Sequence, residues 1–182
     1  ITGMTAARID KLGTLNDIDN SSKFEITYTT SGEITLAQAK TLVDKTTLTA
    51  NTTIDFAGPV KGATTDFYNV GTSRLHNNLL AVLGKDVNAP LKVTDTIEDS
   101  NDVTRLNALE DGDGTNSGTT GQITATLAVS ATDAKNVSLS GQNLTFDIDS
   151  GTLNLTELQA IQGTTGLDVT FSGATKVSDS LS

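Results

Sequence analysis

The chain has 182 residues, with 12 basic and 22 acidic side chains, a formal net charge of −10, one His and no Cys. This length supports one ordinary domain with a hydrophobic core. The lack of Cys excludes disulfides and thiol chemistry, and a single His leaves little material for a zinc site. The acidic charge repels phosphate backbones and anionic lipids, and no run of about 18 apolar residues is present. We therefore expect no nucleic-acid partner and no membrane insertion.

Threonine dominates the composition. The chain contains 32 Thr, and Ser, Asn, Asp and Gly make up much of the remainder, whereas there are only five Phe, two Tyr and no Trp. Thr, Val and Ile favour β-strands, and the apolar residues recur in regular patterns, so an ordered, β-rich protein is favoured over a disordered one. A large aromatic-lined pocket is not expected.

Short amphipathic helices are predicted where apolar or small residues recur at the first, fourth and seventh positions of a seven-residue pattern, because this spacing places them on one helical face. In chain order the copies are Ala6, Ile9 and Leu12; Leu36, Ala39 and Leu42; Val103, Leu106 and Leu109; and Leu155, Leu158 and Ile161. Gly112 and Gly163 close the two best copies, 103–114 and 155–166, as C-cap glycines would. A weaker copy lies in 74–84.

After each helix, a Thr-rich turn leads to a stretch in which apolar and polar residues alternate, the pattern of a strand with one buried face. These stretches are 23–30, 52–58, 90–96, 122–129 and 166–173. Two further alternating pieces, 136–141 and 143–149, form either a hairpin or one degenerate repeat that lacks its helix. The sequence therefore predicts about one strand per helix, at an irregular spacing.

A recurring helix, turn and strand of this size cannot bury its own apolar face and becomes stable by stacking on its neighbours. We therefore predict a β-rich α/β fold, an elongated solenoid of short helix–turn–strand repeats with a parallel sheet. An irregular β-sandwich is the alternative, because strands at such intervals also suit antiparallel packing. The predicted units, in one repeat-built domain over 1–182, are 3–32, 33–58, 59–96, 97–129, 130–150 and 151–173, with the start of a further unit at 174–182.

Both ends of the sequence have the pattern of a repeat unit, and the first residue is Ile1 rather than Met. We therefore expect the chain to be a piece of a longer protein. A solenoid without capping repeats exposes edge strands and apolar groups at its ends. Copies of the chain, or neighbouring repeats of a parent chain, are the partners that this arrangement predicts.

The repeat unit is seen most clearly in ITLAQAKTLVDKTT (34–47) and in LNLTELQAIQGTTG (153–166) followed by LDVTF (167–171). This unit resembles the tandem repeats of very large secreted or surface proteins of marine cyanobacteria and related bacteria, and similar repeats in structural proteins of their phages. The resemblance is compositional, covers most of residues 3–182 and carries no catalytic signature. It implies an extracellular, cell-surface or virion-surface location and a structural or adhesive role. The segment 61–87 fits the unit poorly.

Acidic residues offer two candidate calcium sites. Asp111, Asp113 and Asn116 supply hard oxygen ligands in the Gly-rich stretch 110–118, although their spacing is not that of an EF-hand. The second group consists of Asp147 and Asp149, which share one face of a predicted strand, and Asp168 on the next strand. The competing interpretation is that both groups are solvated acidic surfaces. Calcium is the only cofactor that the sequence indicates.

No catalytic residue is assigned. His76 lacks a Gly-x-Ser-x-Gly elbow and is interpreted as an exposed surface residue, and the scarcity of aromatic residues disfavours a glycoside hydrolase. We therefore expect that the protein is not an enzyme. The leading hypothesis is a structural repeat segment of a surface layer, sheath, filament or phage fibre that self-associates through its edges and ends. The alternative is a calcium-dependent adhesin module that binds glycans or a host surface through the loops around Asp111 and 61–87.

Overall fold

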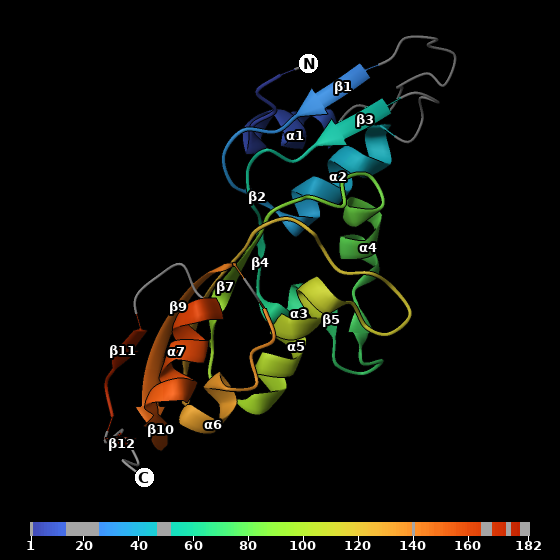
Figure 1. The fold of residues 1–182 in the computed structure, drawn as a ribbon. Coiled ribbons are helices and arrows are strands. Elements are labelled where there is room, and N and C mark those ends of the chain that lie inside the picture. The colour runs from blue at the N-terminus through green and yellow to red at the C-terminus, as the bar shows by residue number, and fades with distance from the viewer. Residues whose placement is uncertain are drawn as a thin grey trace.

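The computed structural model describes residues 2–13, 26–46, 52–139, 141–164, 169–173 and 176–178. The chain forms an elongated α/β structure in which α1 lies near one end and α7 near the other (Figure 1). The helices are α1 (Ala6–Gly13), α2 (Leu36–Thr46), α3 (Thr64–Phe67), α4 (Asn77–Leu83), α5 (Ser100–Asp111), α6 (Ala131–Ala134) and α7 (Leu155–Thr164). The strands are β1 (Ile26–Thr29), β2 (Ile34–Thr35), β3 (Thr52–Asp55), β4 (Val60–Gly62), β5 (Tyr68–Asn69), β6 (Arg74–Leu75), β7 (Leu91–Ile97), β8 (Ile123–Ser130), β9 (Asn143–Ser150), β10 (Thr152–Asn154), β11 (Val169–Phe171) and β12 (Lys176–Ser178).

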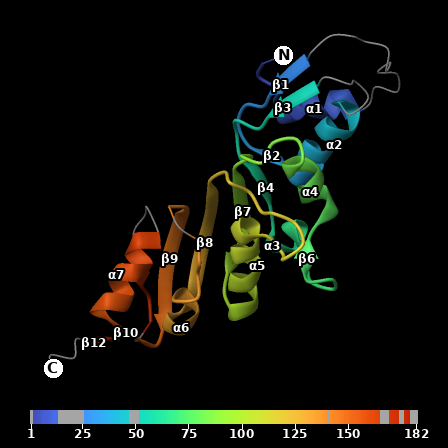
Figure 2. The ribbon, with the colours of Figure 1, turned by 45° about the vertical axis from the view of Figure 1, so that its right-hand side comes forward.

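A six-stranded sheet runs along the molecule in the order β2-β4-β7-β8-β9-β11. Every neighbouring pair in this sheet is parallel, and the spatial order of the strands is their order in the chain. The helices follow the sheet in the same sequence, from α1 and α2 at one end to α7 at the other (Figure 2). The α/β class and the parallel sheet are therefore confirmed, whereas the antiparallel packing of the β-sandwich alternative is absent from this sheet.

The strands are held in register by a row of aliphatic residues. Ile34 pairs with Val60, Val60 with Leu91, and Leu91 with Ile123, and all four side chains are fully buried. Alternate residues of β8 are likewise buried, whereas Thr126 on its other face is exposed. One face of the sheet therefore contributes to the core and the other meets solvent, as the alternating sequence predicts.

Two shorter parallel pairings lie at the two ends of the structure. β1 pairs with β3 and β10 with β12, and a turn separates β1 from β2, β3 from β4 and β9 from β10. The first two turns pack closely: a Cβ placed on Gly58 would lie 2.0 Å from the carbonyl oxygen of Gly32 in the neighbouring unit. Glycine is required at position 58 because no side chain fits in this contact.

Most of the predicted helical stripes are buried. Ile9, the stripe of α2 and the stripe of α5 lie in the core. The stripe of α7 is buried only at Ile161, whereas Leu155 is 45% exposed. Gly112 is the C-cap of α5 with φ of 83°, as expected, but Gly163 lies within α7 and not at its end. Leu12 and part of the stretches 23–30 and 166–173 lie outside the residues whose side chains the structure describes.

Two details of the predicted element order are wrong. The piece 136–141 contributes no strand in its described residues, and β9 follows the short helix α6 directly, so the hairpin interpretation fails. The unit 59–96 holds β4, α3, the antiparallel pair β5–β6, α4 and β7, rather than one helix and one strand. The poor fit of 61–87 to the repeat pattern thus corresponds to a real insertion between two strands of the sheet.

Candidate binding surface at the insertion hairpin

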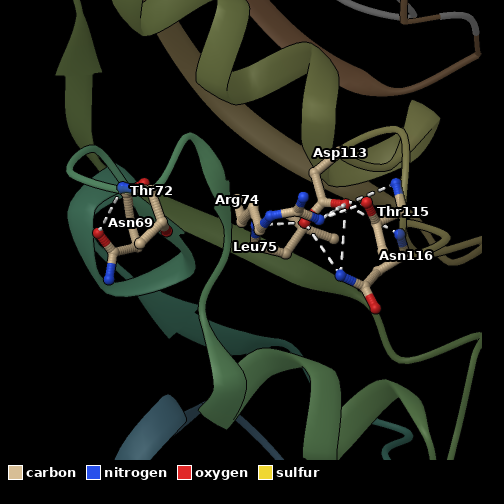
Figure 3. A network of polar contacts seen from close by, with 7 residues as sticks. All are labelled: Asn69, Thr72, Arg74, Leu75, Asp113, Thr115 and Asn116. Carbon is tan, nitrogen blue, oxygen red and sulfur yellow. Dashed lines mark hydrogen bonds and ion pairs between the residues drawn. The ribbon is translucent and has the colours of Figure 1, made fainter.

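The segment between β4 and β7 contains a small antiparallel hairpin. We call residues 68–75, which comprise β5, its turn and β6, the insertion hairpin. The turn residues are exposed, Val70 to 53%, and Ser73 has the positive φ of 54° that a non-glycine residue rarely adopts. A second loop, residues 112–118 after helix α5, packs against this hairpin (Figure 3). The segment 61–87, which fits the repeat pattern poorly, and the acidic Gly-rich stretch 110–118 therefore form one surface.

Asp113 joins the two segments. Its side chain is 0% exposed and accepts hydrogen bonds from the backbone N–H of Leu75 at 2.8 Å, of Thr115 at 3.0 Å and of Asn116 at 2.8 Å. The Asn116 Nδ2 group donates to both Asp113 oxygens, at 3.1 and 3.3 Å (Figure 3). Burial raises the pKa of Asp113, but the hydrogen bonds outweigh this effect, so its pKa lies well below the ordinary range. Asp113 thus remains charged and fastens the hairpin to the loop.

Arg74 lies on the solvent side of this junction. Its Nη1 atom is 4.0 Å from Asp113 Oδ1 and donates to the Thr115 hydroxyl, and the Arg74 side chain is 50% exposed. The Asn69 Oδ1 atom accepts from the backbone N–H of Thr72 at 3.3 Å, which stabilises the turn of the hairpin. These contacts hold a cationic group at the surface of an otherwise acidic protein.

A hollow of about 260 Å³ lies between the insertion hairpin, the start of α4 and Asn116. Its polar lining comprises Asn69, Thr72, Arg74, His76, Asn77 and Asn116, and Leu75 and Leu80 complete it. His76 is half-buried and is the N-cap of α4, where its Nδ1 atom accepts from the backbone N–H of Asn78 at 3.3 Å. The interpretation of His76 as an exposed surface residue is therefore wrong, because the imidazole is partly buried where it caps a helix.

A larger hollow of about 440 Å³ also has His76 in its lining. The lining further includes Thr35 of β2, Lys61 of β4, Asp66 of α3 and Thr94 of β7. Lys92 and Lys61 both pair with Glu33, Lys61 at 3.5 Å, and these contacts lower the pKa of Glu33. The cationic group of Lys61 is therefore engaged in an ion pair with the residue that precedes β2.

The structure places the predicted calcium ligands in separate local contacts. Asp111 accepts from the Ser138 hydroxyl at 2.7 Å, whereas Asp113 and Asn116 face one another as acceptor and donor. Asp147 accepts from the backbone N–H of Ser172 at 2.9 Å, and Asp149 from the Ser150 hydroxyl at 2.7 Å. Asp168 lies outside the described residues, and within those residues no three His, Cys, Asp or Glu side chains form a metal-binding group. Calcium binding remains a prediction.

Sequence reasoning missed Arg74 and the polar residues around it. The signal that could have found them is the disruption of the repeat pattern in 61–87 together with an acidic Gly-rich loop, because insertions in repeat proteins often carry binding residues. Their proximity depends on a long-range contact between Leu75 and Asp113, which no local pattern contains.

Comparisons with protein-family models, with curated proteins and with solved structures found no match. In the part of the chain that the structure describes, no helix combines the length and the apolar character needed to cross a bilayer.

Proposed function

We propose that this protein is a non-catalytic structural repeat segment of an extracellular or virion-surface assembly, built as an elongated α/β solenoid. The observation that carries the proposal is the agreement between the spatial order and the chain order of six parallel strands. Stacked repeats produce this order because each unit contacts only its neighbours. The acidic, Cys-free composition and the resemblance to secreted repeat proteins support the location.

Repeated strand–helix junctions further support a solenoid. In α2, Thr35 and Gln38 exchange hydrogen bonds between side chain and backbone N–H, at 3.0 and 3.2 Å. Asn154 and Glu157 make the same reciprocal pair at α7, at 2.9 and 2.8 Å. Both are capping boxes, in which the last strand residue is also the N-cap of the helix. Two helices far apart in the chain therefore begin with the same capping motif.

Self-association is assigned to two strands near the C-terminal end of the described chain: β11, the edge strand of the six-stranded sheet, and β12, which pairs with β10 in a separate two-stranded sheet. Phe171 is 42% exposed and Val177 is 49% exposed, and no described strand pairs with the outer side of β11. Open strand edges that carry apolar side chains are sites for pairing with a further chain. A second copy, or the next repeat of a parent chain, is the proposed occupant.

Light scattering after size-exclusion chromatography, combined with electron microscopy, tests this role. The wild-type chain is expected to form concentration-dependent oligomers or filaments, and the double variant Phe171→Ser, Val177→Ser is expected to remain monomeric. Val70→Ser is the matched control, because it removes an equally exposed apolar group from the insertion hairpin. A wild type that stays monomeric at every concentration, or a control that loses assembly to the same extent, contradicts the proposal.

A second candidate function is an adhesive module that contacts glycans or a host surface. The observation that favours it is the fixed junction between the insertion hairpin and the loop 112–118, since rigidly presented surface loops are common binding elements. Retention of the chain on immobilised surface glycans, measured with calcium and with chelator, tests this function and its calcium dependence. Retention that is absent under both conditions excludes it.

A further inference from the structure

We propose that the hollow beside Arg74 binds the carboxylate-bearing unit of an acidic polysaccharide. The inference rests on the adhesive function proposed above and names its ligand class and its central residue. The observation that carries it is a half-exposed guanidinium at the rim of a polar hollow of about 260 Å³.

The guanidinium of Arg74 has a free edge for a carboxylate. Both of its contacts, with Asp113 and with the Thr115 hydroxyl, use the Nη1 atom. A guanidinium carries five N–H donors in a planar fork, so Nε and Nη2 are left on one edge without a partner among the described residues. This edge matches the two oxygens of a carboxylate, and the pairing is bidentate. Thr115 and Asp113 fix the plane of the guanidinium and thereby set the direction of the free edge.

The remaining lining suits the hydroxyl groups of a sugar. Asn116 uses its Nδ2 group to contact Asp113, which leaves its Oδ1 atom as an acceptor, and Asn69 uses Oδ1 within the hairpin, which leaves its Nδ2 group as a donor. The Asn77 side chain makes no hydrogen bond to the described part of the chain, so its amide offers both a donor and an acceptor. His76 accepts at Nδ1, so Nε2 is the atom that carries the ring proton in the neutral imidazole.

Size and composition of the hollow favour an acidic sugar over a neutral one. The volume lies below the roughly 300–1,000 Å³ of sites for drug-sized molecules and suits one saccharide unit of a longer chain. No aromatic side chain lines the hollow, so the stacking that commonly holds neutral sugars is missing. Arg74 is the only Lys or Arg side chain in the lining, and its ion pair with Asp113, at 4.0 Å, involves Nη1 and not the free edge. The carboxylate of the ligand therefore provides the main attraction, a short-range contact with Arg74 that opposes the long-range repulsion between an acidic sugar chain and the net charge of −10.

The test is a titration of the ¹⁵N-labelled full chain with oligogalacturonate, followed by NMR. Binding is expected to shift the amide signals of residues around the hollow. The fully methyl-esterified oligomer keeps the sugar hydroxyls but lacks the charge, and it is expected to bind at least about tenfold more weakly. Arg74→Ala is expected to weaken oligogalacturonate binding to a similar extent. Arg74→Lys is expected to restore only part of it, because an ammonium group cannot make the bidentate contact.

Arg8→Ala is the matched control, because it removes an Arg from α1 at the other end of the molecule, where the Arg8 side chain donates only to the Gly3 carbonyl among the described residues. It is expected to leave binding unchanged. Equal binding of the acid and the ester, equal losses in the Arg8 and Arg74 variants, or no binding at all overturns the inference. Retention on surface glycans that survives Arg74→Ala would overturn only the acidic-sugar site and would leave the adhesive function standing.

Discussion

Asp113 is the residue on which the insertion hairpin depends. A buried carboxylate is stable only when its oxygens are satisfied, and here three backbone N–H groups and one amide point at it. Asp113→Asn replaces one carboxylate oxygen, which accepts hydrogen bonds, by an NH₂ group that would face the N–H donors around it. We expect this variant to lose about 2 kcal/mol or more of unfolding free energy, measured by urea denaturation at pH 7. Hydrogen exchange at the Leu75 amide is expected to accelerate as well.

The pH dependence provides an independent check. Because the pKa of Asp113 is depressed in the folded state, its contribution is complete above the unfolded value of about 3.9 and is lost as the pH falls through the folded value. The stability difference between wild type and Asp113→Asn should therefore shrink below about pH 4. Asp111→Asn is the control, because Asp111 is exposed and accepts one hydrogen bond, from Ser138. Similar stability losses in the two variants would contradict this role of Asp113.

The same capping box occurs at two strand–helix junctions, those that precede α2 and α7. At α7 the box formed by Asn154 and Glu157 is reinforced by Lys135, 3.1 Å from Glu157, and these contacts lower the pKa of Glu157. Asn154→Ala removes the N-cap acceptor and is expected to cost about 1 kcal/mol, measured as a lower thermal midpoint and a weaker helical circular dichroism signal. Gln159→Ala, on the exposed side of the same helix, should have little effect. A Gln159 variant as unstable as the Asn154 variant would refute the capping argument.

Helices and strands with a regular spacing of apolar residues could be predicted from the sequence, whereas very short strands could not. The stripe of Val103, Leu106 and Leu109 indicates α5 because a helix must bury a face. The same reasoning predicts β8 and β9 from alternation. Strands as short as β4 and β10, with three residues each, contain too little pattern, and they are recognisable only by their parallel partners. The capping boxes were visible as Thr35/Gln38 and Asn154/Glu157 and would have fixed where two helices begin.

The sequence predicted which segments form the candidate site but not the contacts that their residues make. The sequence marked 61–87 as an exception and 110–118 as an acidic loop, but it assigned the acidic side chains to calcium. Asp113 instead accepts from N–H groups supplied partly by a distant segment. An acidic residue in a Gly-rich loop has the same local pattern in both cases, and only the long-range contact decides between them.

At the scale of the whole molecule, a stack in which units contact only their neighbours should transmit damage over a short range. Leu127 in β8 and Leu42 in α2 are both fully buried but lie in different parts of the stack. Replacing either by Ala should cost about 2–5 kcal/mol. We expect Leu127→Ala to accelerate hydrogen exchange mainly in β7, β8 and β9, and Leu42→Ala mainly in α1, α2 and α4, as measured by mass spectrometry of peptides. If the molecule instead unfolds as one cooperative core, exchange proceeds through global unfolding. Both variants should then accelerate exchange equally in all protected peptides. That result would contradict a solenoid of independently stable units, because the observed strand order would then belong to one cooperative domain.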